Sequence, residues 1–470
     1  MRQSLLTLIC WLLCAILHTA FCQSGPAKPL LIVTTDIGQD PDDLQSMVRL
    51  LHYADQFELL ALIANADNNS ANEQNILQDT LIDQCIEAYA QIEHNLLLHS
   101  EEYPTAEYLR TIVKKGTNQN GINVPMERYV GVGRDTEGSN RILRAVAKAT
   151  QPVAVAVWGG AGDLAQALWK VKNKFEAAQV AMFVEKLRVY FVGQQDSSVE
   201  WILENFPDLW AIVSDHPGGD KWQSTFQGMF LGGDMSITSQ DWLKKHVIGI
   251  NPLSSLYPDK AATGGERYNP NMAMKEGDTP SWFYFLNNGL NIPEHPNFGG
   301  WGGRFEEAKP MRYIDAQDLI YNVELDSVIP SAIATVYRWR QDMQHDFAAR
   351  VTWGSRPYEE ANHHPEIIIS SHVSENIERV ECRAGNDVTF DASASTDPDG
   401  DEIKFEWIFY QEASTFPFCE NLITTVHPEG KIDISLPQTA RGKTIHLILR
   451  VADDSELPLA SYKRMILEVL

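Results

Sequence analysis

Four aspartates lie close together in the stretch TTDIGQDPDD, which runs from residue 34 to residue 43. They are Asp36, Asp40, Asp42 and Asp43. Carboxylates at this spacing repel one another, so a positive charge is expected to gather them. A hard cation such as calcium prefers oxygen ligands of this kind. The alternative is that Asp42 or Asp43 caps a following helix, which explains one aspartate and leaves the others without a role.

The residues around the aspartates predict a strand before them and a helix after them. The run 30–35 is apolar like a strand buried on both faces, and 44–53 has the spacing of an amphipathic helix. These patterns recur, with strands expected at 59–64, 95–99, 153–158 and 188–192 and helices at 73–91, 141–148, 164–172 and 329–350. The alternation predicts an α/β fold with an open, mainly parallel sheet and helices on both faces. Ligands bind such sheets at the carboxyl ends of the strands, where these aspartates lie.

The pattern changes after residue 350. Residues 351–366 are polar and contain two prolines, which predicts a linker between an α/β domain at 28–350 and a second domain at 367–470. Short strand-like runs separated by turn signals predict a small all-β sandwich for the second domain. Within it, Cys382 and Cys419 could form a disulfide. Cys85 in the first domain is expected to be a buried small hydrophobic residue.

The N-terminal end has the features of a secretory signal. Arg2 precedes an apolar run at 5–17, and the small residues Ala20 and Cys22 lie at the expected cleavage point. Residues 1–22 are therefore predicted to be a signal peptide, with a lipid anchor on Cys22 as the alternative. The apolar run is too short to span a membrane, so we expect a secreted or periplasmic protein without an integral membrane segment.

The chain is acidic. Its 470 residues include 63 Asp and Glu against 38 Lys and Arg, which gives a formal charge of −25. Binding to a phosphate backbone requires clustered basic residues, so no nucleic-acid partner is expected. Docking on an anionic membrane surface is disfavoured for the same reason.

The aspartate stretch resembles the signature DTDPGIDD of nucleoside hydrolases, with two residues added in its loop. This resemblance implies that Asp36 is a calcium ligand and the general base. It also implies that Asp42 binds sugar hydroxyls and that Asp43 is a bidentate calcium ligand. Thr34 departs from the signature, which has an aspartate at that place.

Three later stretches are also similar to nucleoside hydrolases, and they follow one another along the chain in the same order as in that family. LALIANADN at 60–68 implies a sugar contact by Asn68. VAVWGGAGDLAQAL at 155–168 implies that Gly162 lends its backbone carbonyl to calcium. The stretch EGD implies that Asp278 is the distal calcium ligand.

Four short motifs extend the resemblance: TEGSNRI at 136–142, VWGG at 157–160, GDTPS at 277–281 and GGWGGR at 299–304. They resemble a family of secreted bacterial proteins that join a nucleoside hydrolase-like domain to a C-terminal immunoglobulin-like domain. Some members are described as cellulose-binding. The resemblance covers nearly the whole chain after the signal peptide and implies an immunoglobulin-like fold for the sandwich.

Two further residues are candidates for substrate contacts. Gln194 follows the predicted strand at 188–192, and Trp301 lies in a glycine-rich stretch where its ring could stack on a sugar. Each has a plain structural alternative. The first stretch could be a polar loop that caps the next helix, and the second could be a flexible connector.

The resemblance implies a calcium-dependent hydrolase of N- or O-glycosidic bonds that acts on an extracellular glycan or furanoside through a metal-activated water. One departure concerns the leaving group. Nucleoside hydrolases commonly have a histidine where this chain has Gly277, and Glu276, Glu137 and His295 are candidate proton donors in its place. The alternative is a non-catalytic carbohydrate-binding or cellulose-binding protein that uses the same pocket or the sandwich. The sequence leaves the oligomeric state open.

Overall fold

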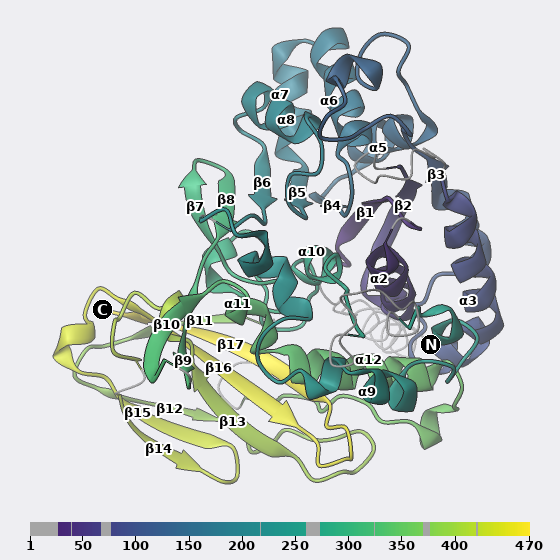
Figure 1. Cartoon of the computed structure of the whole chain (residues 1–470). Coiled ribbons are helices and arrows are strands. Elements are labelled where there is room, and N and C mark those ends of the chain that lie inside the picture. Colours follow the sequence, from purple (N-terminus) through teal and green to yellow (C-terminus); the bar gives the residue numbers. More distant parts are fainter. Residues whose placement is uncertain are drawn as a thin grey trace, which may run out of the picture.

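The computed structural model describes residues 27–38, 40–66, 77–216, 218–259, 273–323, 325–369, 377–419 and 422–470. It has an α/β domain built on a large central sheet and a smaller all-β domain at the C-terminal end (Figure 1). This arrangement confirms the predicted fold class. The predicted signal peptide at 1–22 lies outside the described residues.

The central sheet has eight strands in the order β3-β2-β1-β4-β5-β6-β8-β7. Neighbouring strands from β3 to β8 are parallel, and the edge strand β7 runs antiparallel to β8. The strands are β1 (Leu30–Thr35), β2 (Glu58–Ala64), β3 (Val113–Lys115), β4 (Val153–Val157), β5 (Leu187–Phe191), β6 (Trp210–Val213), β7 (Phe305–Lys309) and β8 (Arg312–Asp315). All residues of β1 and β4 are buried, because these strands are covered on both faces.

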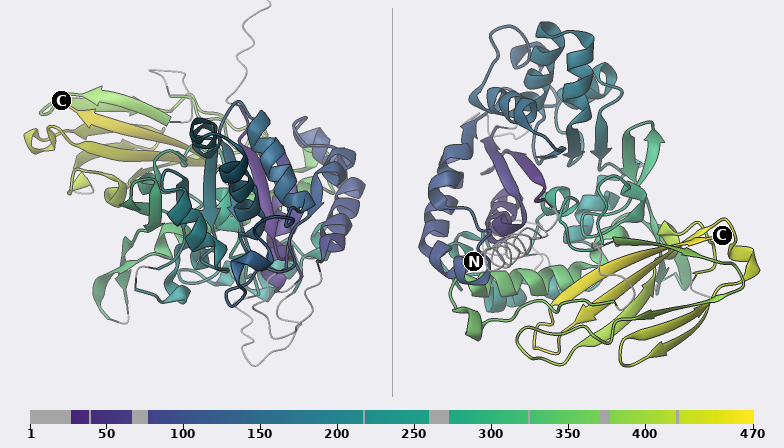
Figure 2. Two further views of the ribbon diagram at one scale, coloured as in Figure 1. Left: turned by 90° about the horizontal axis from the view of Figure 1, so that it is seen from above. Right: turned by 180° about the vertical axis from the view of Figure 1, so that it is seen from behind.

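Helices cover each face of the sheet and bury a separate apolar core against it (Figure 2). One core includes α2 (Pro41–His52), α3 (Asp79–His99), α4 (Ala106–Ile112), α9 (Gln240–His246), α10 (Thr279–Phe283), α11 (Ala334–Tyr337) and α12 (Arg340–Trp353). The other includes α5 (Glu137–Lys148), α6 (Gly162–Lys174), α7 (Ala177–Glu185) and α8 (Ser198–Asn205). Within the described ranges, no helix has the length and apolarity needed to cross a membrane.

Two predicted elements are wrong. Residues 95–99, expected as a strand, form the end of helix α3, where Leu97 and Leu98 are exposed. An apolar run this short fits a strand or a helix equally well, so its pattern could not decide. The helix expected at 329–350 is divided. Pro330 lies in strand β10 (Ser327–Ser331), which pairs with β9 (Asp318–Asn322), and α11 and α12 follow it.

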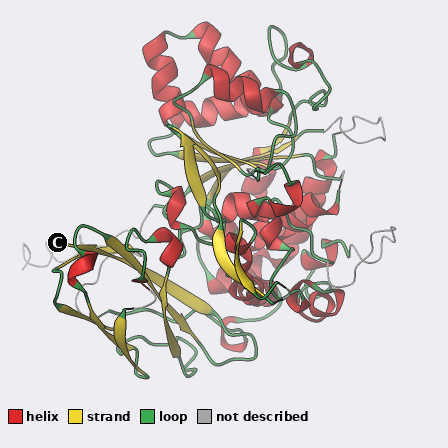
Figure 3. Cartoon of the chain, turned by 60° about the vertical axis from the view of Figure 1, so that its left-hand side comes forward, coloured by secondary structure: helices red, strands yellow, loops and turns green. Residues whose placement is uncertain are grey.

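The C-terminal domain is a sandwich of two sheets with strand orders β11-β17-β16-β13 and β12-β15-β14 (Figure 3). Apolar side chains of both sheets form a core of their own. The strands are β11 (Ile377–Cys382), β12 (Asp387–Asp391), β13 (Lys404–Phe409), β14 (Ile423–His427), β15 (Lys431–Ser435), β16 (Thr444–Ala452) and β17 (Ala460–Val469). The predicted all-β sandwich is therefore confirmed.

The cysteines of the sandwich are thiols. Cys382 and Cys419 both lie in its core, but no disulfide joins them. The Cys382 thiol donates to the Val380 carbonyl at 3.6 Å, and the Cys419 thiol donates to Gln411 Oε1 at 3.1 Å. The disulfide that these two cysteines could form is therefore absent from the described structure. In the α/β domain, Cys85 is buried in an apolar core, as predicted.

The two domains are joined by polar contacts within a shared core. Asp342 of α12 accepts hydrogen bonds at 2.8 and 2.7 Å from Arg450 of β16 and another from the Tyr462 hydroxyl. The Tyr410 hydroxyl of the sandwich donates to Asp318 at 2.8 Å. Tyr410 and Tyr462 belong to the same apolar cluster as side chains of α2 and α12. The core of the α/β domain therefore continues into the sandwich.

We predict that Asp342→Ala lowers the free energy of unfolding by about 3 kcal/mol, because Arg450 and Tyr462 would lose a buried acceptor. Chemical denaturation of the full chain measures this loss. Glu406→Ala is the matched control, since Glu406 lies 3.6 Å from the same arginine but is exposed. Glu406→Ala should lower the free energy of unfolding by less than about 1 kcal/mol. Equal losses in the two variants would contradict the prediction.

Candidate functional site

The aspartate stretch lies where strand β1 passes into helix α2. Asp36 follows the last residue of β1, and Asp42 and Asp43 lie in the first turn of α2. Asp40 is the N-cap residue, but its side chain makes no capping hydrogen bond. Asp43 accepts a hydrogen bond from the Thr35 hydroxyl at the end of the strand. No side-chain cap is formed at this helix start, so capping does not explain the aspartates.

A distant part of the chain brings another carboxylate to this place. Asp278 lies just before α10, and one carboxylate oxygen each of Asp42, Asp43 and Asp278 lie within 4.8 Å of one another. The Ser281 hydroxyl donates to the Asp278 carbonyl at 2.6 Å and accepts from the Trp158 indole N–H at 3.0 Å. Trp158 follows β4, so these hydrogen bonds tie the Asp278 loop to the central sheet.

A buried ion pair fixes helix α2 to the Asp278 loop. The side chains of Arg49 and Glu276 have no exposed surface, and two guanidinium nitrogens lie 2.5 and 2.9 Å from the carboxylate oxygens. Glu276 also accepts hydrogen bonds from the hydroxyls of Tyr257 at 2.6 Å and Thr279 at 2.8 Å. A charge so deeply buried is stable because it is paired and hydrogen-bonded.

Burial and mutual repulsion raise the pKa values of the clustered carboxyls. Burial raises the pKa of Asp42 to about 6, and the attraction of Lys275 opposes this rise. Burial, followed by the charges of Asp36 and Asp42, raises the pKa of Asp43 well above its usual range. The pKa of Asp278 is raised by burial and then by the charge of Asp43. A cation among these groups would favour their charged forms.

Lys275 neutralises one side of this cluster. Its ammonium group pairs with Asp40 and lies 3.5 Å from an Asp42 carboxylate oxygen. Among the described residues, however, Asp278 Oδ2 is buried without a hydrogen-bond partner. A buried carboxylate oxygen in this state is costly. The three carboxylates of Asp42, Asp43 and Asp278 therefore fit a hard divalent cation in charge and in ligand type.

Asp36 lies beside the glycine turn that follows β4. A Cβ at Gly159 would lie 2.2 Å from an Asp36 carboxylate oxygen, and a Cβ at Gly160 would lie 1.6 Å from Asn120 Nδ2. The Asn65 amide, at the end of β2, donates to the Gly160 carbonyl at 2.9 Å. Glycines at these two positions therefore let the polar side chains of Asp36 and Asn120 approach the backbone of this turn.

Two residues predicted for the site have other surroundings, and a third stays a prediction. Gly162 begins α6, where a Cβ would lie 2.9 Å from a Tyr129 ring atom, and the calcium contact of its carbonyl stays a prediction. Gln194 is exposed and lines a separate hollow beside α8. Trp301 is 3 % exposed, and its ring packs against Phe283 at a centroid distance of 5.2 Å. A ring so deeply buried at the domain junction cannot stack on a sugar, so that predicted role is wrong.

Asn65 and Lys275 lie near the aspartates but were not predicted as site residues. Asn68 was predicted as one but has no described position. Asn68 lies outside the described residues, so its sugar contact stays a prediction. Asn65 could have been found, because it directly follows a predicted strand at the ligand-binding edge. Lys275 gave no such signal, because its partners lie far away in the sequence.

The candidate proton donors do not form a pair with the aspartates. Glu276 is excluded because its carboxylate is held by Arg49. Glu137 is exposed in the first turn of α5. His295 stacks on Phe298 at a centroid distance of 4.6 Å. Within the described structure, neither Glu137 nor His295 makes a contact with the aspartate cluster, so none of the three candidates is placed to protonate a leaving group there.

Comparisons with known proteins agree with this architecture. Residues 30–305 match the family described as "Cellulose-binding Sde182, nucleoside hydrolase-like domain", and residues 387–469 match "Cellulose-binding protein Sde0182, C-terminal domain". A solved structure of a nucleoside hydrolase-related hypothetical protein from Saccharophagus degradans, described as associated with carbohydrate metabolism, is 30% identical. The match covers 94% of this chain and 100% of that chain, with a TM-score of 0.73.

Other comparisons are weaker. An inosine-uridine preferring nucleoside hydrolase from Bacillus anthracis is 12% identical over 70% of this chain and 100% of its own, with a TM-score of 0.36. No curated protein matches the chain. The first family match spans more than half of the sequence, and the Saccharophagus protein resembles nearly all of it. The chain therefore belongs to the Sde182 family of nucleoside hydrolase-like proteins.

Proposed function

We propose that the protein is a secreted or periplasmic, calcium-dependent hydrolase of glycosidic bonds in an extracellular glycan or furanoside. The observation that carries the proposal is the group formed by Asp42, Asp43 and Asp278, whose carboxylate oxygens lie within 4.8 Å of one another. Burial raises the pKa values of all three, so their closeness has a cost that a bound cation would remove.

Asp43, Asp278 and Asp36 are the proposed calcium ligands. The unpartnered Asp278 oxygen supports this assignment, as does the position of Asp36 at the end of β1. Calcium prefers several carboxylate oxygens to any nitrogen or sulfur ligand. When bound there, calcium would neutralise the carboxylates, acidify a water molecule and hold sugar hydroxyls.

Asp36 is the proposed general base, and Asp42 is the proposed sugar contact. As a carboxylate, Asp36 accepts a proton from the water that attacks the anomeric carbon of the sugar. Asp42 accepts hydrogen bonds from sugar hydroxyls and so orients the ring. The transition state of glycoside cleavage resembles an oxocarbenium ion, and nearby carboxylates stabilise its positive charge.

The proposed partner is a carbohydrate. The matching families carry the words cellulose-binding in their descriptions, and the Saccharophagus relative is described as associated with carbohydrate metabolism. The predicted signal peptide supports an extracellular substrate. The acidic net charge of −25 suits a neutral polymer better than a nucleic acid.

A non-catalytic carbohydrate-binding function is the second candidate, and the leaving group favours it. An alkoxide that departs from a sugar needs a proton. Gly277 stands before Asp278, where a Cβ would lie 3.2 Å from the ring of Phe226, and Glu276 is held by Arg49. Without a proton donor, the same pocket, or the sandwich, would hold a saccharide without cleaving it.

We predict that calcium raises the thermal unfolding midpoint of the full chain by a few degrees, relative to the same chain in chelator. At a calcium concentration a hundredfold above the dissociation constant, the stabilisation is about 2.7 kcal/mol. Asp43→Asn should abolish the shift, because it removes a charged ligand. In chelator this variant should unfold at or above the wild-type temperature, since one repelling charge is gone. Scanning calorimetry measures both effects.

Asp401→Asn is the control for calcium bound elsewhere, because Asp401 lies in an acidic turn of the sandwich. In that turn, Asp397 already accepts a backbone hydrogen bond from Asp399 at 2.8 Å. The control should keep the full calcium shift. A shift that survives in Asp43→Asn, or a metal-free wild-type chain that does not respond to calcium, would refute the proposed metal site.

We predict that Asp36→Asn lowers any glycosidase turnover at least about a thousandfold, because the variant lacks a base for the attacking water. The assay uses p-nitrophenyl furanosides and soluble cello-oligosaccharides, with enzyme up to stoichiometric amounts. Gln194→Ala is the matched control and should stay within twofold of wild type, since Gln194 lines another hollow. If the wild-type chain releases no product but binds saccharide, catalysis is refuted and the binding function is supported.

A further inference from the structure

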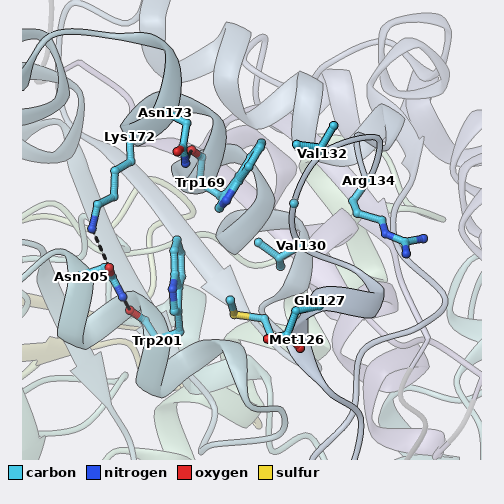
Figure 4. Close-up of a pocket in the computed structure, with 11 residues that line it drawn as sticks. Met126, Glu127, Val130, Val132, Arg134, Trp169, Lys172, Asn173, Trp201 and Asn205 are labelled. Atoms are coloured by element: carbon cyan, nitrogen blue, oxygen red, sulfur yellow. Dashed lines mark hydrogen bonds between the residues drawn. The ribbon is translucent and has the colours of Figure 1, made fainter.

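A hollow of about 470 Å³ lies between helices α6 and α8 and the loop 126–134 (Figure 4). None of its lining residues belongs to the aspartate cluster. The volume is in the range of pockets that bind small molecules. The hollow is therefore a separate place where a ligand could be held.

Each helix contributes a tryptophan to this hollow and, four residues later, an asparagine. Trp169 and Asn173 belong to α6, and Trp201 and Asn205 belong to α8. Each asparagine amide donates to the carbonyl of its own tryptophan, at 2.7 Å in α6 and 2.9 Å in α8. Residues four apart share one face of a helix, so each pair presents an aromatic ring and an amide together. Figure 4 shows all four side chains around the hollow.

The aromatic rings are accompanied by polar groups. Lys172 donates to the Asn205 side-chain oxygen at 2.6 Å. Glu127 and Arg134, both exposed, belong to the loop that forms the opposite wall of the hollow (Figure 4). The two indole side chains are partly exposed, although each also packs against the apolar core below. The hollow therefore combines exposed aromatic surface with charged and amide hydrogen-bonding groups.

The loop that forms one wall is held in place by Gln166 of α6. This side chain is 1 % exposed, accepts from the Gly131 N–H at 2.7 Å and donates to the Gly131 carbonyl at 3.1 Å. It also donates to Asp135 at 2.8 Å. Gly131 has a φ of 137°, which favours glycine at this point of the loop. A wall fixed in this way needs little ordering when a ligand binds.

We propose that this hollow is a second saccharide-binding site, separate from the aspartates, which takes a β-linked glucan chain. Sugar rings with equatorial hydroxyls have flat C–H faces that pack on indole rings, and their edges carry donors and acceptors. The two tryptophans supply surfaces for such faces, while Asn173, Asn205 and Lys172 lie beside them for the hydroxyls. Each of these polar side chains already makes at least one hydrogen bond within the protein, and the asparagine side-chain oxygens have lone pairs that can accept a further one from a sugar hydroxyl.

Titration of the full chain with cellohexaose, followed by calorimetry, tests the proposal. Trp169→Ala and Trp201→Ala should each weaken binding at least tenfold. Because both tryptophans also pack on the core, Asn173→Arg is a second test: it fills the hollow from an exposed position and should weaken binding equally. Trp222→Ala is the matched control, since Trp222 is 44 % exposed and does not line the hollow.

Asp43→Asn separates this site from the proposed function. It should leave cellohexaose binding here unchanged while it removes the calcium response. Binding that is lost in Asp43→Asn but kept in Asn173→Arg would place the saccharide at the aspartates and overturn the proposal. The proposal is also overturned if the wild-type chain does not bind cellohexaose. The proposal is likewise overturned if Asn173→Arg weakens the binding of an apolar dye to the chain but leaves cellohexaose binding unchanged.

Discussion

The buried ion pair between Arg49 and Glu276 holds together the parts of the chain on which the candidate site depends. Arg49 belongs to the helix of Asp42 and Asp43, and Glu276 lies two residues before Asp278. The same guanidinium group donates to α12 through the Gln344 side chain at 2.6 Å. Removal of either partner would leave a buried charge without compensation. The position of the carboxylates is therefore fixed by an ion pair that includes none of the proposed calcium ligands.

The aspartates themselves work against the fold. Burial and repulsion raise the pKa of Asp43 and Asp278, so the protein spends part of its stability to keep them together. Three features keep the aspartates together despite this cost. They are the apolar packing around α2, the ion pair between Arg49 and Glu276, and the positive charge of Lys275. A site of this kind is preorganised, because the ligand atoms are gathered before a cation arrives. The free energy that the clustered carboxylates cost without a cation would add to the affinity of a cation bound among them.

Local patterns in the sequence predicted strands β1, β2, β4 and β5 of the central sheet and the aspartate loop, but not strands β3, β6, β7 and β8. The apolar run 30–35 matches β1 at both ends, because a strand buried on both faces is uniformly apolar. Patterns failed where the decisive contacts are distant. The run 95–99 continues a helix, and Trp301 is buried by contact with the sandwich, as its centroid distance of 6.3 Å to Tyr462 shows. Lys275 pairs with Asp40 only because the fold brings them together, and no spacing in the sequence predicts this contact.

The core that runs from the α/β domain into the sandwich has an evolutionary consequence. Tyr410 and Tyr462 belong to the sandwich by sequence, but they complete the apolar cluster of the larger domain. Recombination that separated this sandwich from the α/β domain would expose these rings and leave Asp342 without Arg450. The two domains therefore depend on each other for a complete core. Homologues that carry one domain without the other would need compensating changes at the surface where the partner is missing.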